Sequence, residues 1–303
     1  MKMKEKLEVD MSGRICLVTG ATNGIGKATA QALAEMGANV VIVGRNPAKC
    51  AAVVSEIKHV SGNDAVEALI ADLSIMAEIR QVADQFKAKY QQLHVLVNNA
   101  GGAFGKRQVT SEGFEKTFAL NHLNYFLLTS LLLNMLTASA PARIVNVSSD
   151  SHKGAHLDFD DLQSEKGNFR FNAYGRSKLA VVVFSYELAR RLSGTGVTCN
   201  VLHPGLVRTG FASNMGAVPS AVIGFFMRFV ALTPEQGAQT SVYLATSPDV
   251  ENVTGKYWEK SRAVPSGRAT YDESTWMRLW EVSDKMVAAS ATRAKADIAQ
   301  PRQ

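Results

Sequence analysis

The stretch LVTGATNGIGKATA, residues 17–30, decides how the rest of the chain is interpreted. It begins with apolar residues typical of a strand, ends in residues typical of a helix, and places Gly20, Gly24 and Gly26 in the turn between them. Glycine allows a backbone to turn tightly and to approach a pyrophosphate, which the N–H groups at a helix start can bind. The spacing G-x-x-x-G-x-G differs from the dinucleotide fingerprint G-x-G-x-x-G, so alone it also fits an ordinary tight turn in an α/β protein.

Strand-like and helical sequence alternate along the rest of the chain. Short apolar runs predict strands at 15–18, 39–43, 66–71, 94–98, 143–147 and 197–202. Because these runs are almost continuously apolar, they are typical of strands covered on both faces of a parallel sheet. The alternation predicts an α/β fold: a single-domain, doubly wound parallel sheet (Rossmann fold) of about seven strands with helices on both faces.

No internal repeat, low-complexity segment or linker divides the chain, so it reads as one domain. We expect an N-terminal extension over residues 1–12 and the domain itself over 13–287. The remaining tail, 288–303, is small and polar, and we expect it to fray.

Composition excludes several classes of protein. The 303 residues are 46% hydrophobic and 20% charged, as in an ordinary globular protein. The net charge of +6 is scattered or lies near the ends, without interleaved aromatic residues, so we expect no nucleic-acid binding. A phosphorylated ligand suits this charge equally well.

Cysteine usage and the N-terminal sequence predict a location. Three cysteines at unrelated spacings indicate neither a disulfide framework nor a zinc site. The first residues are too charged for a signal peptide, and no apolar run reaches about 18 residues. We therefore expect a cytoplasmic protein.

The segment YGRSK, residues 174–178, begins an apolar helical stretch. Tyr174 and Lys178 are four residues apart, so on a helix they project from one face as neighbours. A free phenol has a pKa near about 10, and an adjacent ammonium favours the phenolate and lowers that pKa. The pair is therefore either an acid/base pair or an ordinary start of an amphipathic helix.

The end of the second predicted strand, VVIVGRN, bears on cofactor choice. In dinucleotide-binding folds an acid near this place hydrogen-bonds the ribose of NAD, whereas an arginine accommodates the 2′-phosphate of NADP. Here Gly44 stands where an acid could be, and Arg45 follows. We expect NADP(H) rather than NAD, the alternative being that Arg45 is a solvated surface residue.

Further motifs follow in one order over most of the chain. They are TGATNGIG, ADL at 71–73, NNAG at 98–101, Asn121, VNVSS at 145–149, YGRSK, and HPGLVRTG at 203–210. Together they resemble the short-chain dehydrogenase/reductase superfamily. Within it, TGATNGIGKATA, DFDDLQSEKGNF and YGRSKLA are similar to the retinol-dehydrogenase-like branch, whose members are mostly NADP(H)-dependent and act on apolar carbonyls and alcohols.

The resemblance implies catalytic roles for four residues. Tyr174 would protonate the carbonyl oxygen as hydride arrives from the nicotinamide, and Lys178 would lower the pKa of Tyr174 and hold the nicotinamide ribose. Ser149 would donate a hydrogen bond to the substrate oxygen, with Ser148 as the competing candidate. Asn121 would fix a water that links the lysine to solvent.

The resemblance also implies a cofactor site. Its residues are Gly20, Thr22, Asn23, Gly24, Ile25 and Gly26 by the pyrophosphate, Arg45 by the 2′-phosphate, Asp72 and Leu73 by the adenine, Asn98, Ala100 and Gly101 by the adenosine ribose, Tyr174 and Lys178, and Pro204, Gly205, Val207 and Thr209 by the nicotinamide. Many NADP-binding relatives carry a basic residue within the glycine turn, where this chain has Thr22 and Asn23. The phosphate assignment therefore depends on Arg45.

Two segments allow other interpretations. His152 and His156 lie close in sequence to three aspartates, Asp158, Asp160 and Asp161, but the loop has no third histidine, so we expect no metal site and a solvated loop instead. The apolar stretch 217–236 falls mostly within the substrate lid that the resemblance predicts at about 205–235. A peripheral membrane contact or an oligomer contact are the alternatives for this stretch.

The predicted function is NADP(H)-dependent hydride transfer to or from a small hydrophobic aldehyde, ketone or alcohol. A non-catalytic NADP-binding regulator and a membrane-peripheral interaction protein are the alternatives. The apolar run at 126–136 and the helix of Tyr174 are compatible with either a homodimer interface or the interior of a monomer.

Overall fold

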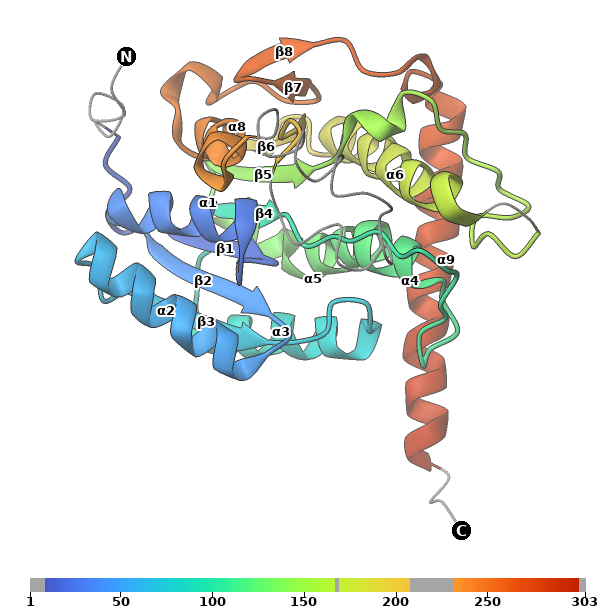
Figure 1. The fold of residues 1–303 in the computed structure, drawn as a ribbon, viewed down its shortest axis with the longest axis horizontal. Coiled ribbons are helices and arrows are strands. Elements are labelled where there is room, and N and C mark those ends of the chain that lie inside the picture. The colour runs from blue at the N-terminus through green and yellow to red at the C-terminus, as the bar shows by residue number, and fades with distance from the viewer. Residues whose placement is uncertain (1–8, 167–168, 208–231, 300–303) are drawn as a thin grey trace, which may run out of the picture.

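The computed structural model describes residues 9–166, 169–207 and 232–299, which form one open sheet with helices on both faces (Figure 1). The strands lie in the order β3-β2-β1-β4-β5-β6-β7-β8. Their bounds are β1 Ile15–Thr19, β2 Asn39–Gly44, β3 Val66–Ile70, β4 Val95–Asn98, β5 Ala142–Val147, β6 Val197–His203, β7 Tyr257–Glu259 and β8 Arg262–Val264. All neighbouring pairs are parallel except β7 and β8. The predicted doubly wound sheet is confirmed, and its two shortest strands are those that no apolar run indicated.

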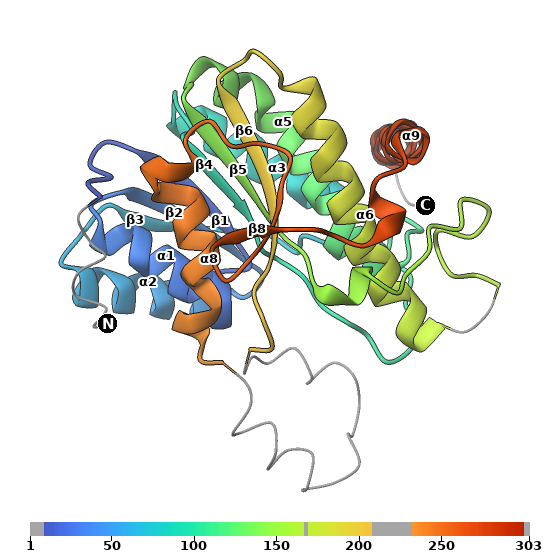
Figure 2. The same cartoon turned by 90° about the horizontal axis from the view of Figure 1, so that it is seen from above.

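The helices form two layers (Figure 2). One face of the sheet carries α1 (Gly24–Glu35), α2 (Pro47–Ser61) and α8 (Pro234–Thr246). The other carries α3 (Met76–Lys89), α5 (Asn124–Ala138) and α6 (Phe169–Arg191). Shorter turns are α4 (Lys116–Phe118), the π-helical turn η2 (Ala119–Leu123), and the 3₁₀ turns η3 (Asp150–His152), η5 (Pro248–Val250) and η6 (Arg268–Thr270). Each central strand is thus buried on both faces, as its apolar sequence requires.

Local sequence explains where these helices begin and end. At the start of α2, Asn46 Oδ1 accepts a hydrogen bond of 2.9 Å from the Lys49 N–H, and Pro47 occupies the first turn. At its end Gly62 takes a left-handed conformation, φ 66°. Asn46 and Pro47 determine where α2 begins, which is directly after Arg45 at the end of β2.

Helix α9 (Glu273–Ala299) packs beside α6 and covers an aromatic surface formed by α5 and α6 (Figures 1 and 2). The Trp280 ring lies 4.9 Å from Phe126 and 5.9 Å from Phe184, measured between centroids. Further along α9, Arg80 Nη2 donates to the Val287 carbonyl at 2.8 Å. We expected a frayed tail from residue 288. Instead, α9 continues to Ala299, and the part of the helix that packs on the protein includes the buried Ser290.

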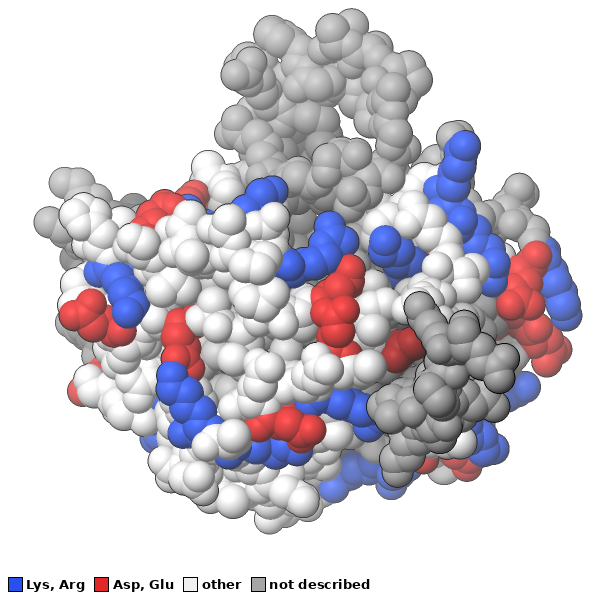
Figure 3. Space-filling model, turned by 90° about the horizontal axis from the view of Figure 1, so that it is seen from below, with Lys and Arg blue, Asp and Glu red and all other residues white. Residues whose placement is uncertain are grey.

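The apolar run at 126–136 is partly buried within this one chain. Phe126, Leu128, Leu132 and Leu136, from the apolar run at 126–136, are buried in the core of this one chain. One side of the run therefore lies in the interior of the protomer, whereas Ser130 and Asn134 on its other side are exposed. On the molecular face in Figure 3, basic and acidic side chains are interspersed. No helix in the described part of the chain combines the length and the apolar character that crossing a bilayer requires.

Candidate active site

A cleft of about 610 Å³ lies where the carboxyl ends of the strands meet. Loops that follow β1 to β6 contribute to its wall, and strand order reverses between β1 and β4, the usual ligand position in such sheets. The predicted residues that line the cleft are Gly20, Thr22, Asn23, Gly24, Ile25, Gly26, Arg45, Asp72, Leu73, Ala100, Gly101, Tyr174, Lys178 and Pro204. The fold thus brings the glycine turn and the Tyr–Lys pair to one cavity.

The glycine turn is shaped for an anion. Gly20 and Gly24 have positive φ values of 65° and 54°. A Cβ atom on Gly26 would lie 2.4 Å from Asn99 Nδ2 and 2.5 Å from the Gly20 carbonyl oxygen, so no side chain fits there. Asn23, at the N-cap of α1, makes no side-chain capping hydrogen bond, and the first turn carries no acidic residue. The N–H groups at the start of α1 are therefore available to the pyrophosphate of a dinucleotide, which fits this turn.

Asn98, a predicted cofactor residue, does not line the cleft. Its buried side chain lies inside the fold and donates hydrogen bonds to Thr129 Oγ1 at 3.0 Å and Asn146 Oδ1 at 2.9 Å. The next residue, Asn99, lines the cleft and donates from Nδ2 to the carbonyl oxygens of Thr19 and Gly20. Asn98 is the last residue of β4, and Asn99 begins the loop that follows, so of these two neighbours it is Asn99 that lies at the cleft.

The end of the cleft beside β2 is basic. Arg45 Nη1 lies 3.3 Å from Asp72 Oδ2, and the arginine side chain is 71% exposed. Lys49, in the first turn of α2, lines the same wall and was not predicted. Burial acts to raise the pKa of Asp72, but hydrogen bonds from Ser74 and Arg45 hold that pKa below its ordinary value. The described wall therefore offers two cations and one ionised carboxyl group to a ligand.

Little space is available for a side chain at Gly44, the last residue of β2. A Cβ atom at position 44 would lie 2.4 Å from Thr22 Cγ2 and 2.7 Å from Cys50 Sγ. A side chain at position 44 would require the Thr22 and Cys50 side chains to move. With glycine here, β2 ends without a carboxylate that would repel a 2′-phosphate.

Tyr174 and Lys178 face the cleft from α6, as their spacing predicted. Lys178 Nζ donates to the Val147 carbonyl at 2.9 Å and lies 5.9 Å from the centroid of the Tyr174 ring. Burial lowers the pKa of Lys178 to about 7. Burial also raises the pKa of Tyr174 to about 12, although a hydrogen bond with Ser149 acts in the opposite direction. The expected lowering of the tyrosine pKa by Lys178 is therefore not found in the protein alone.

The two candidate serines have different surroundings. Ser148 lines the cleft, but its hydroxyl donates to the Lys178 carbonyl at 2.8 Å and thereby joins β5 to α6. Ser149 is only partly buried and hydrogen-bonds Tyr174. Its hydroxyl lies 3.2 Å from the Ser151 hydroxyl. Of the two, Ser149 is the one whose hydroxyl meets the tyrosine.

Asn121 lies behind the cleft wall in the π-helical turn η2, a kind of irregularity often found at functional sites. Its Oδ1 accepts from the Gly102 N–H at 2.8 Å, and its Nδ2 donates to the Gly102 carbonyl at 3.0 Å and to Ser177 Oγ at 2.8 Å. A Cβ atom on Gly101 would lie 3.1 Å from Asn121 Oδ1 and 3.3 Å from Lys178 Nζ. Asn121 therefore fixes the loop after β4 against α6 beside Lys178.

The remaining cleft residues were not assigned to the site from the sequence. They are Val43, Gly44, Asn46, Lys49, Ala71, Asn99, Gly102, Phe104, Gln108, Lys116, Leu120, Val147 and Ser148. Lys49 follows Arg45 by four residues at a helix start, which is the one spacing that could have indicated it. Gly205 and Val207 do not line the cleft. Thr209 and most of the predicted lid and apolar stretch lie outside the described residues.

The histidine-rich loop is partly exposed, as at Lys153 and His156, but His152 is an exception. His152 is buried, and both of its ring nitrogens are bonded to backbone groups, those of Ser149 and Gly267. Within the three described ranges no cluster of three or more metal-binding side chains occurs.

Comparison with known proteins relates the whole chain to one group. The sequence profile of the short chain dehydrogenases matches residues 14–218. Human retinol dehydrogenase 13 is 40% identical over 285 residues, which are 92% of this chain and 86% of that protein. Human polyprenol dehydrogenase is 42% identical over 279 residues, 90% of this chain and 84% of that protein. The solved Pseudomonas aeruginosa RhlG/NADP active-site complex is similar with a TM-score of 0.67 and 30% identity, over 86% of this chain and 98% of that one.

Proposed function

Because the chain belongs to the short-chain dehydrogenase family of oxidoreductases, we propose that it transfers a hydride between NADP(H) and a hydrophobic aldehyde or ketone, or the corresponding alcohol. The observation that carries the proposal is that Tyr174 and Lys178 line the same cleft as the uncapped start of α1. One end of the cavity suits a dinucleotide, and the other holds a proton donor. A pure binding protein has no need of that donor.

The chain's own residues divide the work around the reacting carbonyl. The nicotinamide, when bound, supplies or accepts the hydride. Tyr174 stays protonated near neutral pH because burial raises its pKa to about 12, so it can give a proton to the substrate oxygen. Ser149, already bonded to Tyr174, would donate a second hydrogen bond to that oxygen. Lys178 would hold the nicotinamide ribose, and Asn121 keeps the backbone beside it in place.

Three features support NADP(H) over NAD. Arg45 and Lys49 offer two positive charges at the adenosine end of the cleft, where an arginine accommodates a 2′-phosphate. Gly44 stands where a competing acid could be, and the Thr22 and Cys50 side chains leave little room for one. A solved relative of 30% identity was determined as an NADP complex. Together Arg45 and Lys49 take the place of the basic residue that the glycine turn lacks.

An apolar substrate is proposed from the relatives and the cleft wall. Two relatives of about 40% identity are named for retinol and polyprenol, both alcohols with long apolar chains. Phe104 and Leu120 contribute apolar surface to the same cleft as Tyr174. A cytoplasmic location remains our proposal, supported by three buried free cysteines.

The test is NADPH consumption with a panel of apolar aldehydes and bulky ketones, followed by absorbance. Tyr174→Phe should lose on the order of 10²–10⁴ in kcat while its affinity for NADPH changes little, because only the proton donor is removed. Tyr90→Phe, which removes a phenol hydroxyl bonded to Glu67 outside the cleft, is the matched control. A Tyr174→Phe variant with wild-type turnover refutes the mechanism. NADPH binding without turnover of any substrate would instead favour the regulator alternative.

A further inference from the structure

We propose that His152 is a positioning residue for Ser149, acting as a neutral imidazole that connects the Ser149 carbonyl to the backbone of Gly267. The inference rests on the proposed function, which gives the Ser149 hydroxyl its part in the reaction. It adds a residue that contacts neither substrate nor cofactor but determines where Ser149 lies.

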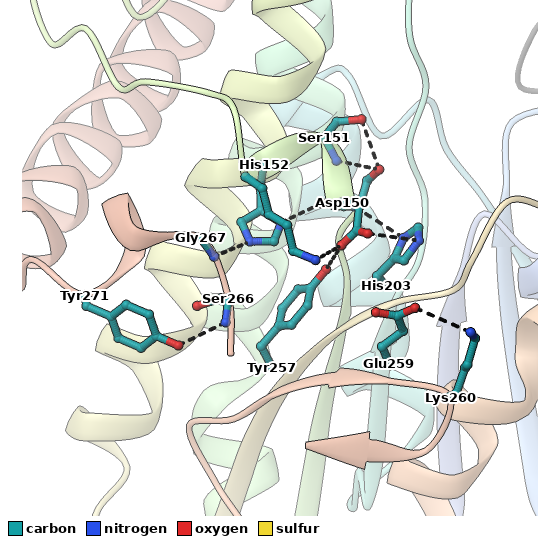
Figure 4. Close-up of polar contacts among 12 residues, drawn as sticks. Asp150, Ser151, His152, His203, Tyr257, Glu259, Lys260, Ser266, Gly267 and Tyr271 are labelled. Atoms are coloured by element: carbon teal, nitrogen blue, oxygen red, sulfur yellow. Dashed lines mark hydrogen bonds and ion pairs between the residues drawn. The ribbon is translucent and has the colours of Figure 1, made fainter. Parts of the chain in front are cut away.

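The tautomer of His152 follows from its two partners. His152 Nδ1 lies 2.7 Å from the Ser149 carbonyl oxygen, and the Gly267 N–H donates to Nε2 at 2.9 Å (Figure 4). A carbonyl can only accept and a backbone N–H can only donate, so a single state satisfies both: the proton on Nδ1 and none on Nε2. The ring is 0% exposed, and burial lowers its pKa, in agreement with a neutral imidazole.

The Gly267 end of this connection is anchored to α6. Ser266 Oγ lies 2.7 Å from Tyr186 OH, and the Ser266 N–H donates to Tyr271 OH at 2.9 Å. A Cβ atom on Gly267 would lie 3.0 Å from the Lys153 Cα and 3.3 Å from His152 Cδ2, so the segment lies directly against the turn. His152 therefore bonds to a fixed support.

The other side of the turn lies on the same helix that carries the acid. A Cβ atom on Gly175 would lie 2.9 Å from the Ser151 carbonyl oxygen, which shows that η3 touches α6 one residue after Tyr174. The turn from Ser149 to His152 is thus held between α6 and the Gly267 segment. Its placement sets the hydrogen bond between Ser149 and Tyr174.

The charged groups around the turn have other partners. Asp150 Oδ1 accepts from Lys153 Nζ at 2.8 Å and from Tyr257 OH at 3.1 Å, and the Asp150 N–H donates to His203 Nδ1 at 3.3 Å (Figure 4). The contact of His152 with Tyr257 is between rings, with centroids 4.8 Å apart. His152 is therefore no member of an ion pair, and its two backbone hydrogen bonds define its role.

Substitution of His152 by asparagine or by glutamine tests its two hydrogen bonds separately. The amide of asparagine reaches about as far as Nδ1, so His152→Asn can still donate to the Ser149 carbonyl but cannot reach Gly267. The amide of glutamine reaches about as far as Nε2, so His152→Gln can still accept from Gly267 but cannot bond Ser149. His59→Gln, at an exposed position of α2, is the control for the substitution itself.

We expect His152→Gln to lower kcat by about 10- to 100-fold, as supporting residues of a site commonly do, with KM and NADPH affinity within about threefold of wild type. His152→Asn should keep kcat within about threefold, although both variants lose similar thermal stability because each loses one buried hydrogen bond. Equal kcat in the two variants, or kcat that follows the melting temperature, overturns the proposal and leaves a structural role.

Tyr186→Phe provides a second readout if His152→Gln does not fold. It removes the bond to Ser266 without touching the turn, and we expect kcat to fall about 3- to 10-fold at constant KM. An unchanged kcat would overturn the proposal. Ser149→Ala distinguishes a failure of the proposed function from a failure of the role of His152. Full activity of this variant would contradict the proposed function and not the role of His152.

Discussion

Replacing Arg45 with alanine should separate the two nicotinamide cofactors. Only NADPH carries the 2′-phosphate that the guanidinium would contact, so NADPH should bind more weakly while NADH is almost unaffected. The variant leaves β2 and the glycine turn intact, because the arginine side chain is 71% exposed and packs into no core.

The magnitude follows from what Arg45 does before a ligand arrives. Its ion pair with Asp72, 3.3 Å long, joins one side chain that is 71% exposed to one that is 26% exposed. Exposed pairs of this kind contribute about 0–1 kcal/mol, so Arg45 can leave Asp72 at little cost. A hydrogen bond to a charged group contributes about 1.5–3 kcal/mol. The net loss for NADPH is therefore about 0.5–3 kcal/mol, a factor of roughly 2 to 150 in Kd.

The assay is a direct titration of each cofactor, followed by protein fluorescence, at two salt concentrations. Lys49→Ala should show a smaller loss of the same kind, and the double variant tests whether both cations serve one phosphate. Lys89→Ala, which removes a positive charge that pairs with Glu67 away from the cleft, measures the general effect of net charge. Higher salt should narrow the difference between wild type and Arg45→Ala, since mobile ions screen exposed charges.

The reasoning is refuted if Arg45→Ala weakens NADH as much as NADPH. That result would mean that the arginine acts through Asp72 and the adenosine pocket common to both cofactors. A loss for Lys89→Ala equal to that for Arg45→Ala would also contradict a specific contact.

Three further predictions concern stability. Lys178→Met should abolish turnover yet raise the free energy of unfolding at pH 6 by about 2–4 kcal/mol in urea titrations. The reason is that burial lowers the Lys178 pKa to about 7, so that below this pH the folded protein must hold a charged amine in its interior, which opposes folding. The gain in the free energy of unfolding should shrink as the pH rises toward about 10.5. The double variant His122→Phe, Ser283→Ala should lose less free energy of unfolding than the wild type as the pH falls from 6.5 to 3. Burial holds the His122 pKa at about 3, so the wild type loses up to about 4–5 kcal/mol across that window. Plots of the free energy of unfolding against pH that run parallel for both proteins would contradict this. Trp280→Ala should cost about 2–4 kcal/mol by removing the ring stacked on Phe184, and an unchanged unfolding midpoint would show that α9 is not stabilised there.

The sequence predicts those parts of the site whose geometry is local. The glycine turn is one strand–turn–helix unit, and Tyr174 and Lys178 are one helical turn apart, so spacing alone places them. Asn98 ends β4 with its side chain bonded inside the fold, which its place in the NNAG motif does not reveal. Lys49 and Phe104 come from a helix start and a loop, where no periodic pattern exists.

Burial and long-range packing account for the remaining differences. The Tyr174 pKa rises because the surrounding fold removes the phenol from water, an effect that the residue four positions away does not reveal. His152 reads as a loop histidine in sequence, and its partner Gly267 is 115 residues distant. Only the last part of α9, from residue 288, looks like a polar tail in sequence, and a small polar composition does not reveal that the helix continues there.

The order in which the elements are synthesised has a consequence for α9. Helices α5 and α6 leave the ribosome long before residue 273, and until then the aromatic surface around Phe126 and Phe184 has no cover from this chain. A nascent or truncated chain that ends before α9 would present that surface to chaperones or to other copies of itself. Messages with a premature stop in this region should therefore yield aggregated or degraded protein, even though every residue of the cleft has already been made.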